Sequence, residues 1–224
     1  MKISEIPEDQ RPREKLLNKG SSYLSTEELL AIFLRIGTKN KSAIDLAKDL
    51  LHTFGGLRGL YSADINSLFK ITGIGKAKIS QLLAVIELTK RYLEENIKDR
   101  KFIEDSKSIF DYLYLTMRDL DYELFKIIYL NGQNQVLNIE DIFKGTITHS
   151  HIYIREIIKG ALRNSATSIV CVHNHPSGNS TPSDVDIKIT QKIKESCELI
   201  GIVFQDHIII GDNQYFSFRD RELI

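Results

Sequence analysis

The sequence contains few of the residues that typify secreted or membrane proteins. Its 224 residues include 2 cysteines, 4 prolines and no tryptophan. Two cysteines are too few for a disulfide framework, which predicts a reducing compartment. The longest apolar run, residues 29–34, is far shorter than the ~20 residues that a membrane span needs. The N-terminal residues also lack the apolar core of a secretory signal, so we expect neither export nor a membrane partner.

Charge of one sign is not in excess either. The chain has 30 basic and 30 acidic residues, so its net charge is zero. Residues 1–100 carry 17 Lys and Arg against 13 Asp and Glu, a difference of +4, and residues 101–224 carry 13 against 17, a difference of −4. This modest asymmetry permits an anionic partner for the first half and does not require one.

Length and hydrophobic pattern predict two modest domains rather than one large core. Ser25 is expected to cap the first helix, with Glu28 three residues later completing a capping box. Residues 94–101 are charged and sparse in apolar side chains, which predicts a linker. Apolar residues at helical spacing predict that the first half is helical over residues 25–34, 42–52, 62–69 and 76–95.

The second half alternates short apolar strands with helices, which predicts an α/β or α+β domain. The dipeptide Asn131-Gly132 separates two of the strands and is typical of a hairpin turn. The expected strands are residues 124–130, 135–139, 167–172, 202–210 and 215–218, and the expected helices are residues 154–164 and 183–199.

The most specific pattern is His173-Asn174-His175-Pro176, followed by Ser183-x-x-Asp186. Alternate residues of a strand share a face, so both imidazoles can point at one ion. The aspartate falls in the first turn of the next predicted helix and can supply a third ligand. Two imidazoles and one carboxylate, with a fourth position open to water, are typical of a catalytic zinc site. Such an ion lowers the pKa of water towards ~7 and polarises a carbonyl oxygen.

Ordinary structural roles compete with this interpretation. Ser183 with an acid three residues later is also a common helix N-terminus. A second His-x-His, at His149 and His151, provides an internal control. No proline follows it, and the position that matches the aspartate is Leu162, which cannot bind a metal. We therefore predict that this second pair forms no part of a metal site.

A separate pattern in the first half suggests contact with nucleic acid. Residues 71–78 (ITGIGKAK) lie between two predicted helices. Gly73 and Gly75 allow a tight turn whose N–H groups can meet a phosphate at a helix N-terminus. Lys76 and Lys78 add positive charge. The segment resembles a helix-hairpin-helix motif, which grips the DNA backbone without reading sequence. A helix–helix turn with two solvated lysines is the alternative.

The histidine pattern resembles the JAMM (MPN-type) metalloprotease motif, in which a Glu precedes His-x-His-Pro and Ser-x-x-Asp. The fuller pattern is similar to the RadC family, and the first half has the layout of that family's N-terminal part. Pattern and resemblance together predict a helical helix-hairpin-helix domain at 1–98 and an α/β JAMM-like (cytidine-deaminase-like) domain at 103–224 of a bacterial cytoplasmic protein. The blocks that carry the resemblance are residues 143–146 (FKGT), 155–156 (RE), 173–178 (HNHPSG) and 206–211 (DHIIIG).

The resemblance also implies roles for the residues of the motif. Zn²⁺ would be held by His173, His175 and Asp186. Ser183 would donate a hydrogen bond to the developing oxyanion. An upstream glutamate would take a proton from water and deliver it to the leaving amine.

The identity of that glutamate stays open at this point. Glu123 opens the first predicted strand and fits the position best, with Glu156 and Glu140 as alternatives. Glu156 falls inside a predicted helix, where an ion pair is the ordinary explanation. We interpret His207 as a strand histidine with an ordinary hydrogen bond, and a role in orienting a ligand is its alternative. Cys171 is interpreted as a small buried hydrophobe.

These observations lead to one principal hypothesis, a zinc-dependent hydrolase of amide or isopeptide bonds that acts on a peptide or protein and associates with the DNA backbone. The alternative is a non-enzymatic DNA-associated protein with a structural or vestigial zinc, and the intact motif favours the enzyme. A metal-dependent nuclease is less favoured, because one such site lacks the extra carboxylates of a two-metal centre. The RadC family is associated with DNA repair.

Overall fold

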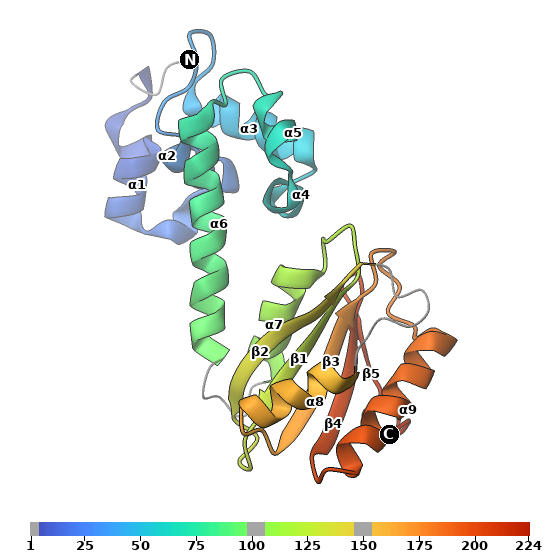
Figure 1. The fold of residues 1–224 in the computed structure, drawn as a ribbon. Coiled ribbons are helices and arrows are strands. Elements are labelled where there is room, and N and C mark those ends of the chain that lie inside the picture. Colours follow the sequence, from blue (N-terminus) through green and yellow to red (C-terminus); the bar gives the residue numbers. More distant parts are fainter. Residues whose placement is uncertain (1–4, 98–105, 146–153) are drawn as a thin grey trace. The chain divides into compact units, whose positions relative to one another are not determined.

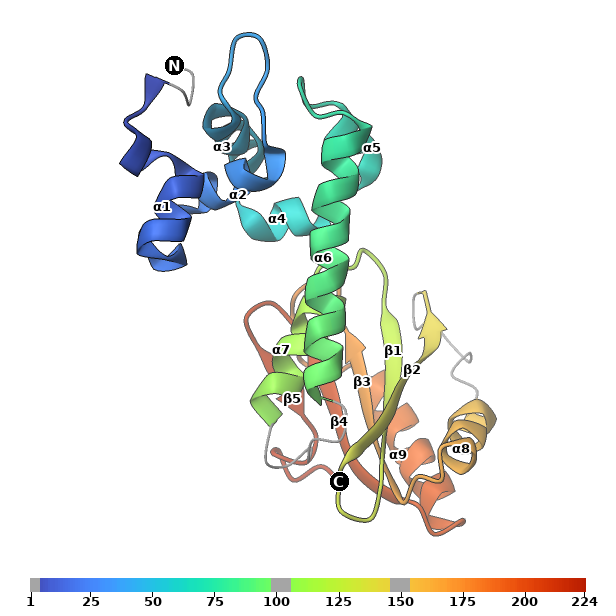
Figure 2. The same ribbon diagram turned by 90° about the vertical axis from the view of Figure 1, so that its left-hand side faces the viewer.

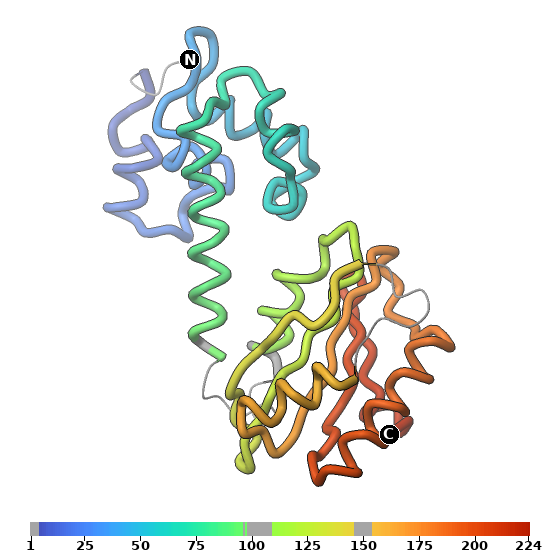
Figure 3. Tube along the Cα trace, in the orientation of Figure 1, coloured from blue at the N-terminus to red at the C-terminus, as the bar shows by residue number. Residues whose placement is uncertain are grey.

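The computed structural model describes residues 5–97, 106–145 and 154–224 (Figure 3). The chain divides into two compact units, Met1–Thr89 and Lys90–Ile224. In the described part of the chain, no helix is both long enough and apolar enough to cross a membrane.

The first unit is built from helices in its described residues (Figure 1). Leu46 and Leu50, at the centre of its core, are fully buried. The elements are η2 (Glu8–Gln10), α1 (Pro12–Lys19), η3 (Ser21–Tyr23), α2 (Thr26–Leu34), α3 (Ala43–Phe54), α4 (Leu57–Ser62), α5 (Ile65–Phe69) and the first part of α6 (Lys76–Ile97). The predicted helical character of this half is therefore confirmed.

The predicted capping box at the start of α2 is also confirmed. Ser25 Oγ accepts a hydrogen bond from the Glu28 N–H at 3.3 Å, and the Glu28 carboxylate accepts one from the Ser25 N–H at 2.8 Å. Ser42 and Asp45 form the same arrangement at the start of α3. Because each box satisfies two N–H groups that have no partner within the helix, the starts of both core helices are fixed.

Two helix boundaries differ from expectation. The predicted helix over residues 62–69 is divided, because α4 ends at Ser62 and the Asp64 side chain caps α5 by accepting from the N–H groups of Asn66 and Ser67. The expected linker is helical as far as Ile97, which is 1% exposed and packs in the core of the second unit. The sparse apolar residues of that segment thus suffice to anchor the end of α6.

The second unit contains a mixed five-stranded sheet in the order β2-β1-β3-β4-β5. β3 and β4 are parallel, and the other neighbours are antiparallel. The strands are β1 (Leu124–Leu130), β2 (Val136–Lys144), β3 (Ser168–Asn174), β4 (Val203–Ile210) and β5 (Tyr215–Ser217). The predicted mixture of strands and helices is confirmed.

Helices cover both faces of this sheet (Figure 2). On one face lies α7 (Ser106–Met117), and on the other lie α8 (Ile154–Arg163) and α9 (Asp184–Glu198). Every residue of β1 and β3 is consequently buried. Helix α7 was not predicted from the sequence, although its Ile109, Leu113 and Met117 pack on the sheet at helical spacing.

The predicted hairpin between β1 and β2 is present, but its turn differs in detail. Asn134, with φ 59°, is the residue in the left-handed region, and Gly132 is not. The Asn131 side chain accepts hydrogen bonds from the N–H groups of Gln133 and Gln135. Asn131 therefore organises the turn through its side chain, in a longer loop than the two-residue form its dipeptide favours.

A tight contact holds α8 against β1, and it generates a prediction. A Cβ atom at Gly160 would lie 2.0 Å from the Tyr129 hydroxyl oxygen. Gly160→Ala should therefore lower the free energy of unfolding by about 1–3 kcal/mol through overpacking, as measured by urea unfolding followed by circular dichroism. The Tyr129 hydroxyl is buried without a partner among the described residues, so Tyr129→Phe should return part of the lost stability to the double variant. Wild-type stability of Gly160→Ala would contradict this packing.

Candidate metal centre

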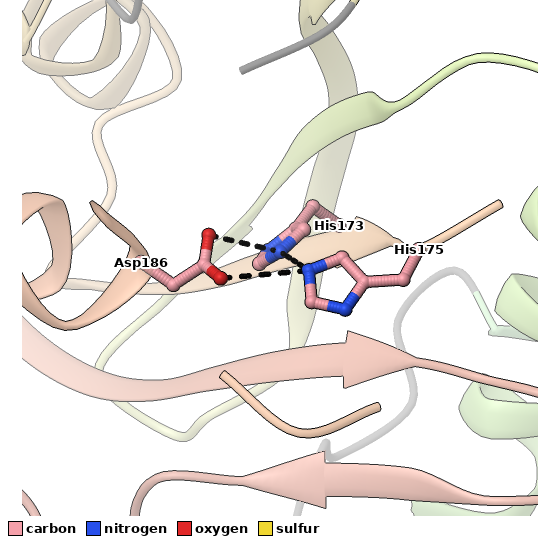
Figure 4. Close-up of side chains that lie close together, drawn as sticks. All are labelled: His173, His175 and Asp186. Carbon is pink, nitrogen blue, oxygen red and sulfur yellow. Dashed lines mark hydrogen bonds and ion pairs between the residues drawn. The ribbon is translucent and has the colours of Figure 1, made fainter. Parts of the chain in front are cut away.

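The three predicted metal ligands come together where the central strand β3 ends. His173 is the penultimate residue of β3, His175 follows the strand, and Asp186 lies in the first turn of α9. Their ligand atoms all lie within 4.8 Å of one another, and Figure 4 shows the three side chains converging. In the described part of the chain, no other group of three or more such residues is close enough to hold a metal ion.

The distances within this group are short. His173 Nε2 lies 3.0 Å from His175 Nε2 and 3.2 Å from Asp186 Oδ1, and His175 Nε2 lies 3.4 Å from Asp186 Oδ2. The side chains of His173 and Asp186 are 0% and 3% exposed, and that of His175 is 15% exposed. The group is thus buried on the side of the sheet and open to solvent beside His175.

The loop after β3 fixes the orientation of His175. Its Nδ1 lies 2.7 Å from the carbonyl oxygen of Asn179. A carbonyl oxygen only accepts, so Nδ1 must carry the hydrogen of this bond. Nε2 then presents its lone pair to the other two side chains when the imidazole is neutral, which is the form that binds a metal ion.

Ser183 holds the carboxylate of Asp186. Asp186 Oδ2 accepts from the Ser183 N–H at 2.7 Å and from Ser183 Oγ at 2.6 Å, and Ser183 Oγ accepts from the Asp186 N–H at 3.2 Å. This is a complete capping box, so the structural interpretation of Ser183 is realised. Since Oδ2 is engaged by two donors, Oδ1 is the oxygen left to face His173.

These three side chains direct acceptor atoms at one another. A carboxylate and two imidazole lone pairs at such distances require a positive charge among them, either a proton or a metal ion. The pKa values of all three side chains are shifted by burial and by these contacts. Burial lowers the pKa of His173, whereas in His175 the bonds to Asp186 and Asn179 outweigh burial and raise the pKa. Burial would raise the pKa of Asp186, but its contacts with both histidines and with Ser183 prevail and lower it.

Backbone contacts pin the loop between β3 and α9. The carbonyl oxygen of Gly178 accepts from the Asp212 N–H at 2.7 Å. A Cβ at Gly178 would lie 2.9 Å from Arg118 Nη2, and one at Gly211 would lie 2.6 Å from the Gly178 oxygen. Arg118 also pairs with Asp212 at 3.3 Å. The β4–β5 turn and the end of α7 therefore hold the loop that carries His175.

His207 contacts the site directly, in contrast to our preferred interpretation. Its Nε2 lies 2.8 Å from His173 Nδ1, and both rings are 0% exposed. The hydrogen bond of His207 is therefore made to a predicted metal ligand, which corresponds to the alternative role, orienting a ligand. The parallel pairing of β3 with β4, in which Cys171 lies opposite His207, produces this contact. No sequence spacing reveals that register.

Cys171 is a buried free thiol, in agreement with its interpretation as a small buried hydrophobe.

Glu123 immediately precedes β1. The register of β1 with β3 ends at the pair of Phe125 with His173, which lies two residues from Glu123 along one strand and two residues from His175 along the other. Burial and Asp186 have the larger effects on the pKa values of both histidines, and the charge of Glu123 acts on both in the raising direction. Glu123 is therefore close enough to the group to influence its protonation.

The two alternative glutamates lie in other surroundings. Glu140, on β2, accepts hydrogen bonds from Asn138, Arg163 and Asn164. Glu156, on α8, is half-exposed and pairs with the side chains of Arg155 and Lys159 at 3.1 Å each. The second His-x-His, His149 and His151, lies outside the described residues.

The predicted hairpin of the first unit occupies the turn between α5 and α6. Gly73 has φ 91°, and a Cβ there would lie 2.2 Å from the Thr38 side chain, whereas a Cβ at Gly75 would meet nothing within 4 Å. Lys76 is exposed. Lys78 Nζ donates to the Gly73 carbonyl at 2.8 Å, and burial lowers its pKa. Gly75 and Lys76 therefore face open space, while Gly73 and Lys78 build the turn.

Two family models match separate parts of the chain. Residues 3–80 match the UPF0758 N-terminal domain, and residues 103–223 match the RadC-like JAB domain. A UPF0758 protein of Bacillus licheniformis is 46% identical over 221 residues, which cover 99% of each chain. UPF0758 proteins of Janthinobacterium sp. (strain Marseille) and Nitrosospira multiformis are each 42% identical, over 98% and 100% of each chain. The resemblance to RadC is confirmed, and the chain belongs to the UPF0758 family, with that family's N-terminal domain followed by a RadC-like JAB domain.

Proposed function

We propose that this protein is a zinc-dependent hydrolase of amide or isopeptide bonds. The observation that carries the proposal is the convergence of three acceptor groups, His173, His175 and Asp186, which lie within 4.8 Å of one another. Membership of a family with a JAB domain supports the same chemistry. Substrates of this class are peptides or proteins, because the bond to be broken joins a carbonyl carbon to an amine.

The chemistry of the donor set fits Zn²⁺. Two imidazole nitrogens and one carboxylate oxygen are common zinc ligands, and a site with three protein ligands leaves a position for substrate or water. His173 Nε2, His175 Nε2 and Asp186 Oδ1 would hold the ion. Zn²⁺ in such a site supplies Lewis acidity, which polarises a carbonyl group and makes water more acidic.

Two further side chains would act on the substrate. Glu123, the residue before β1, would accept a proton from the attacking water and deliver it to the leaving amine. Ser183 Oγ would donate a hydrogen bond to the oxyanion. Its hydroxyl now donates to Asp186 Oδ2, which also accepts from the Ser183 N–H. The carboxylate therefore keeps one donor when the hydroxyl rotates towards a substrate.

The exposure of the site favours an enzyme over the alternative of a structural or vestigial zinc. Structural zinc sites are closed by four protein ligands, whereas this group offers three and is open beside His175. The nuclease hypothesis finds less support, because the described residues contain no second cluster of ligands that would hold another metal ion.

We further propose that the first unit contacts the DNA backbone through the turn between α5 and α6, as in a helix-hairpin-helix motif. The open space at Gly75 and the exposed Lys76 at the start of α6 support this proposal. Phosphate oxygens can approach N–H groups there, since a helix N-terminus favours anions. Such contacts carry no base specificity. Because the RadC family is associated with DNA repair, a role near damaged DNA is part of this proposal.

A cytoplasmic location is also part of the proposal. Cys171 and Cys197 are both buried free thiols, which suits a reducing compartment. The relatives named above come from bacteria.

The zinc site generates the first functional prediction. The purified full-length protein should bind one Zn²⁺. Asp186→Asn, which replaces an anionic ligand by a neutral amide, and His175→Ala, which removes an imidazole, should each weaken binding by at least about 10–100-fold, the loss typical of changes to the groups around a ligand. Isothermal titration with elemental analysis measures both quantities. Asp184→Asn is the matched control, since Asp184 is an exposed carboxylate in the same helical turn. Full zinc content in Asp186→Asn would overturn the ligand set, and loss of zinc in His151→Ala would add the second histidine pair to it.

The proposed proton carrier generates a separate prediction. Glu123→Gln preserves size but removes the basic carboxylate, so the variant should retain zinc and lose about 10²–10⁴-fold in hydrolysis rate. The rate is measured on a panel of peptides and isopeptide-linked conjugates, with zinc content determined in parallel. Glu156→Gln should leave the rate unchanged. If the rate falls in Glu156→Gln and not in Glu123→Gln, the proton carrier is on α8.

The hairpin generates a prediction about DNA. The protein should bind duplex DNA weakly, with a slope of about −1 to −3 in log K against log of the salt concentration, because few phosphates are contacted. Lys76→Glu and Gly75→Val should each weaken binding without unfolding the protein, the latter by blocking backbone approach. Fluorescence anisotropy at several salt concentrations measures this. Lys19→Glu, the same charge change on α1, is the control. If Lys19→Glu weakens DNA binding equally, the weakening comes from net charge alone, and the proposed contact of the turn between α5 and α6 with DNA is refuted.

A further inference from the structure

A chain of buried hydrogen bonds runs from one proposed ligand to the backbone of another. His173 Nδ1 lies 2.8 Å from His207 Nε2, His207 Nδ1 lies 2.5 Å from Thr190 Oγ1, and Thr190 Oγ1 lies 2.6 Å from the carbonyl oxygen of Asp186. His173 and His207 are 0% exposed and Thr190 is 1% exposed. Water therefore does not compete for these hydrogen bonds, and each donor and acceptor in the series must be satisfied by its neighbour.

The direction of the chain is determined at its far end. The Asp186 carbonyl oxygen can only accept, so Thr190 must direct its single hydroxyl hydrogen to it. The opposite arrangement would leave two oxygen atoms 2.6 Å apart with no hydrogen between them. Thr190 Oγ1 consequently accepts from His207, and His207 carries its hydrogen on Nδ1.

The same reasoning continues to the ligand. A neutral His207 with its hydrogen on Nδ1 has a lone pair on Nε2, which must accept from His173 Nδ1–H. His173 then has its lone pair on Nε2, the atom that faces His175 and Asp186. Phe218 stacks on the His207 ring at 5.1 Å between centroids, and Phe125 packs edge-on at 5.5 Å. These apolar neighbours disfavour a charged His207 and fix its ring.

We propose that His207 and Thr190 are positioning residues, which hold His173 in the tautomer with hydrogen on Nδ1 and so direct its Nε2 lone pair to the cation. The inference rests on the metal site proposed above and adds two residues that act through His173. His175 reaches the same state by a different route, through the Asn179 carbonyl. The two imidazoles are thus held in the tautomer with hydrogen on Nδ1 by independent parts of the polypeptide.

The first test observes the tautomers directly. Long-range ¹H–¹⁵N correlation spectra of the ¹⁵N-histidine-labelled full-length protein, after zinc removal with a chelator, distinguish a hydrogen on Nδ1 from one on Nε2. Both His173 and His207 should carry a hydrogen on Nδ1, and His207→Gln assigns the signals. A His173 ring without a hydrogen on Nδ1, or a His207 ring with its hydrogen on Nε2 alone, would overturn the proposal. This measurement needs no metal and no enzymatic activity.

The second test measures zinc affinity by chelator competition. Thr190→Val has nearly the shape of threonine without the hydroxyl, and it should weaken zinc binding by about 10–100-fold and disturb the His173 tautomer. Thr190→Ser, which keeps the hydroxyl, should restore both. If Thr190→Val does not fold, His207→Gln replaces it, since an amide can accept from His173 and should weaken zinc binding less than His207→Leu.

The outcomes separate this inference from the proposed function. A folded Thr190→Val with wild-type zinc affinity and an unchanged His173 tautomer refutes the positioning roles and leaves the metal site intact. A wild-type protein that binds no zinc refutes the proposed function. In that case the positioning roles towards a cation fall with it, whatever tautomers the spectra report.

Discussion

Three hydrogen-bond acceptors face one another where β3 ends and α9 begins, and their need for a shared positive charge is the constraint on which the second unit depends. The ligand atoms lie within 4.8 Å, and two of the three side chains are almost fully buried. Burying an unpaired charge in this way is costly unless a counter-charge is supplied. Burial prevails at His173 and lowers its pKa, whereas at His175 the hydrogen bonds to Asp186 and Asn179 outweigh burial and raise the pKa.

Each acceptor is held by a different part of the fold. The mixed sheet places His173 in its buried centre, where β4 brings His207 behind it. The loop after β3 turns back so that Asn179 orients His175, and the β4–β5 turn holds that loop through Gly178. The capping box of α9 aims Asp186. Strand order, loop closure and helix capping thus converge on one geometry, which local sequence preferences support.

Much of this arrangement could be predicted from the sequence, for identifiable reasons. His-x-His at a strand end and an aspartate in a first helical turn are local patterns, so their convergence follows from short-range geometry. The capping box of α2 follows from two residues. The roles of His207 and Thr190 could not be predicted, because they depend on the parallel register of β3 with β4 and on the packing of α9. The hydrogen bond from Lys78 to the Gly73 carbonyl was not anticipated either, because the spacing of residues does not determine the conformation of a long side chain.

The central claim is that a zinc ion occupies the space among these three side chains. Anomalous X-ray scattering from crystals grown with zinc, with data collected on both sides of the zinc absorption edge, tests it most directly. We predict one anomalous peak within bonding distance of His173 Nε2, His175 Nε2 and Asp186 Oδ1, strong above the edge and weak below it. A peak at other residues, or none here in crystals that contain zinc elsewhere, would contradict it.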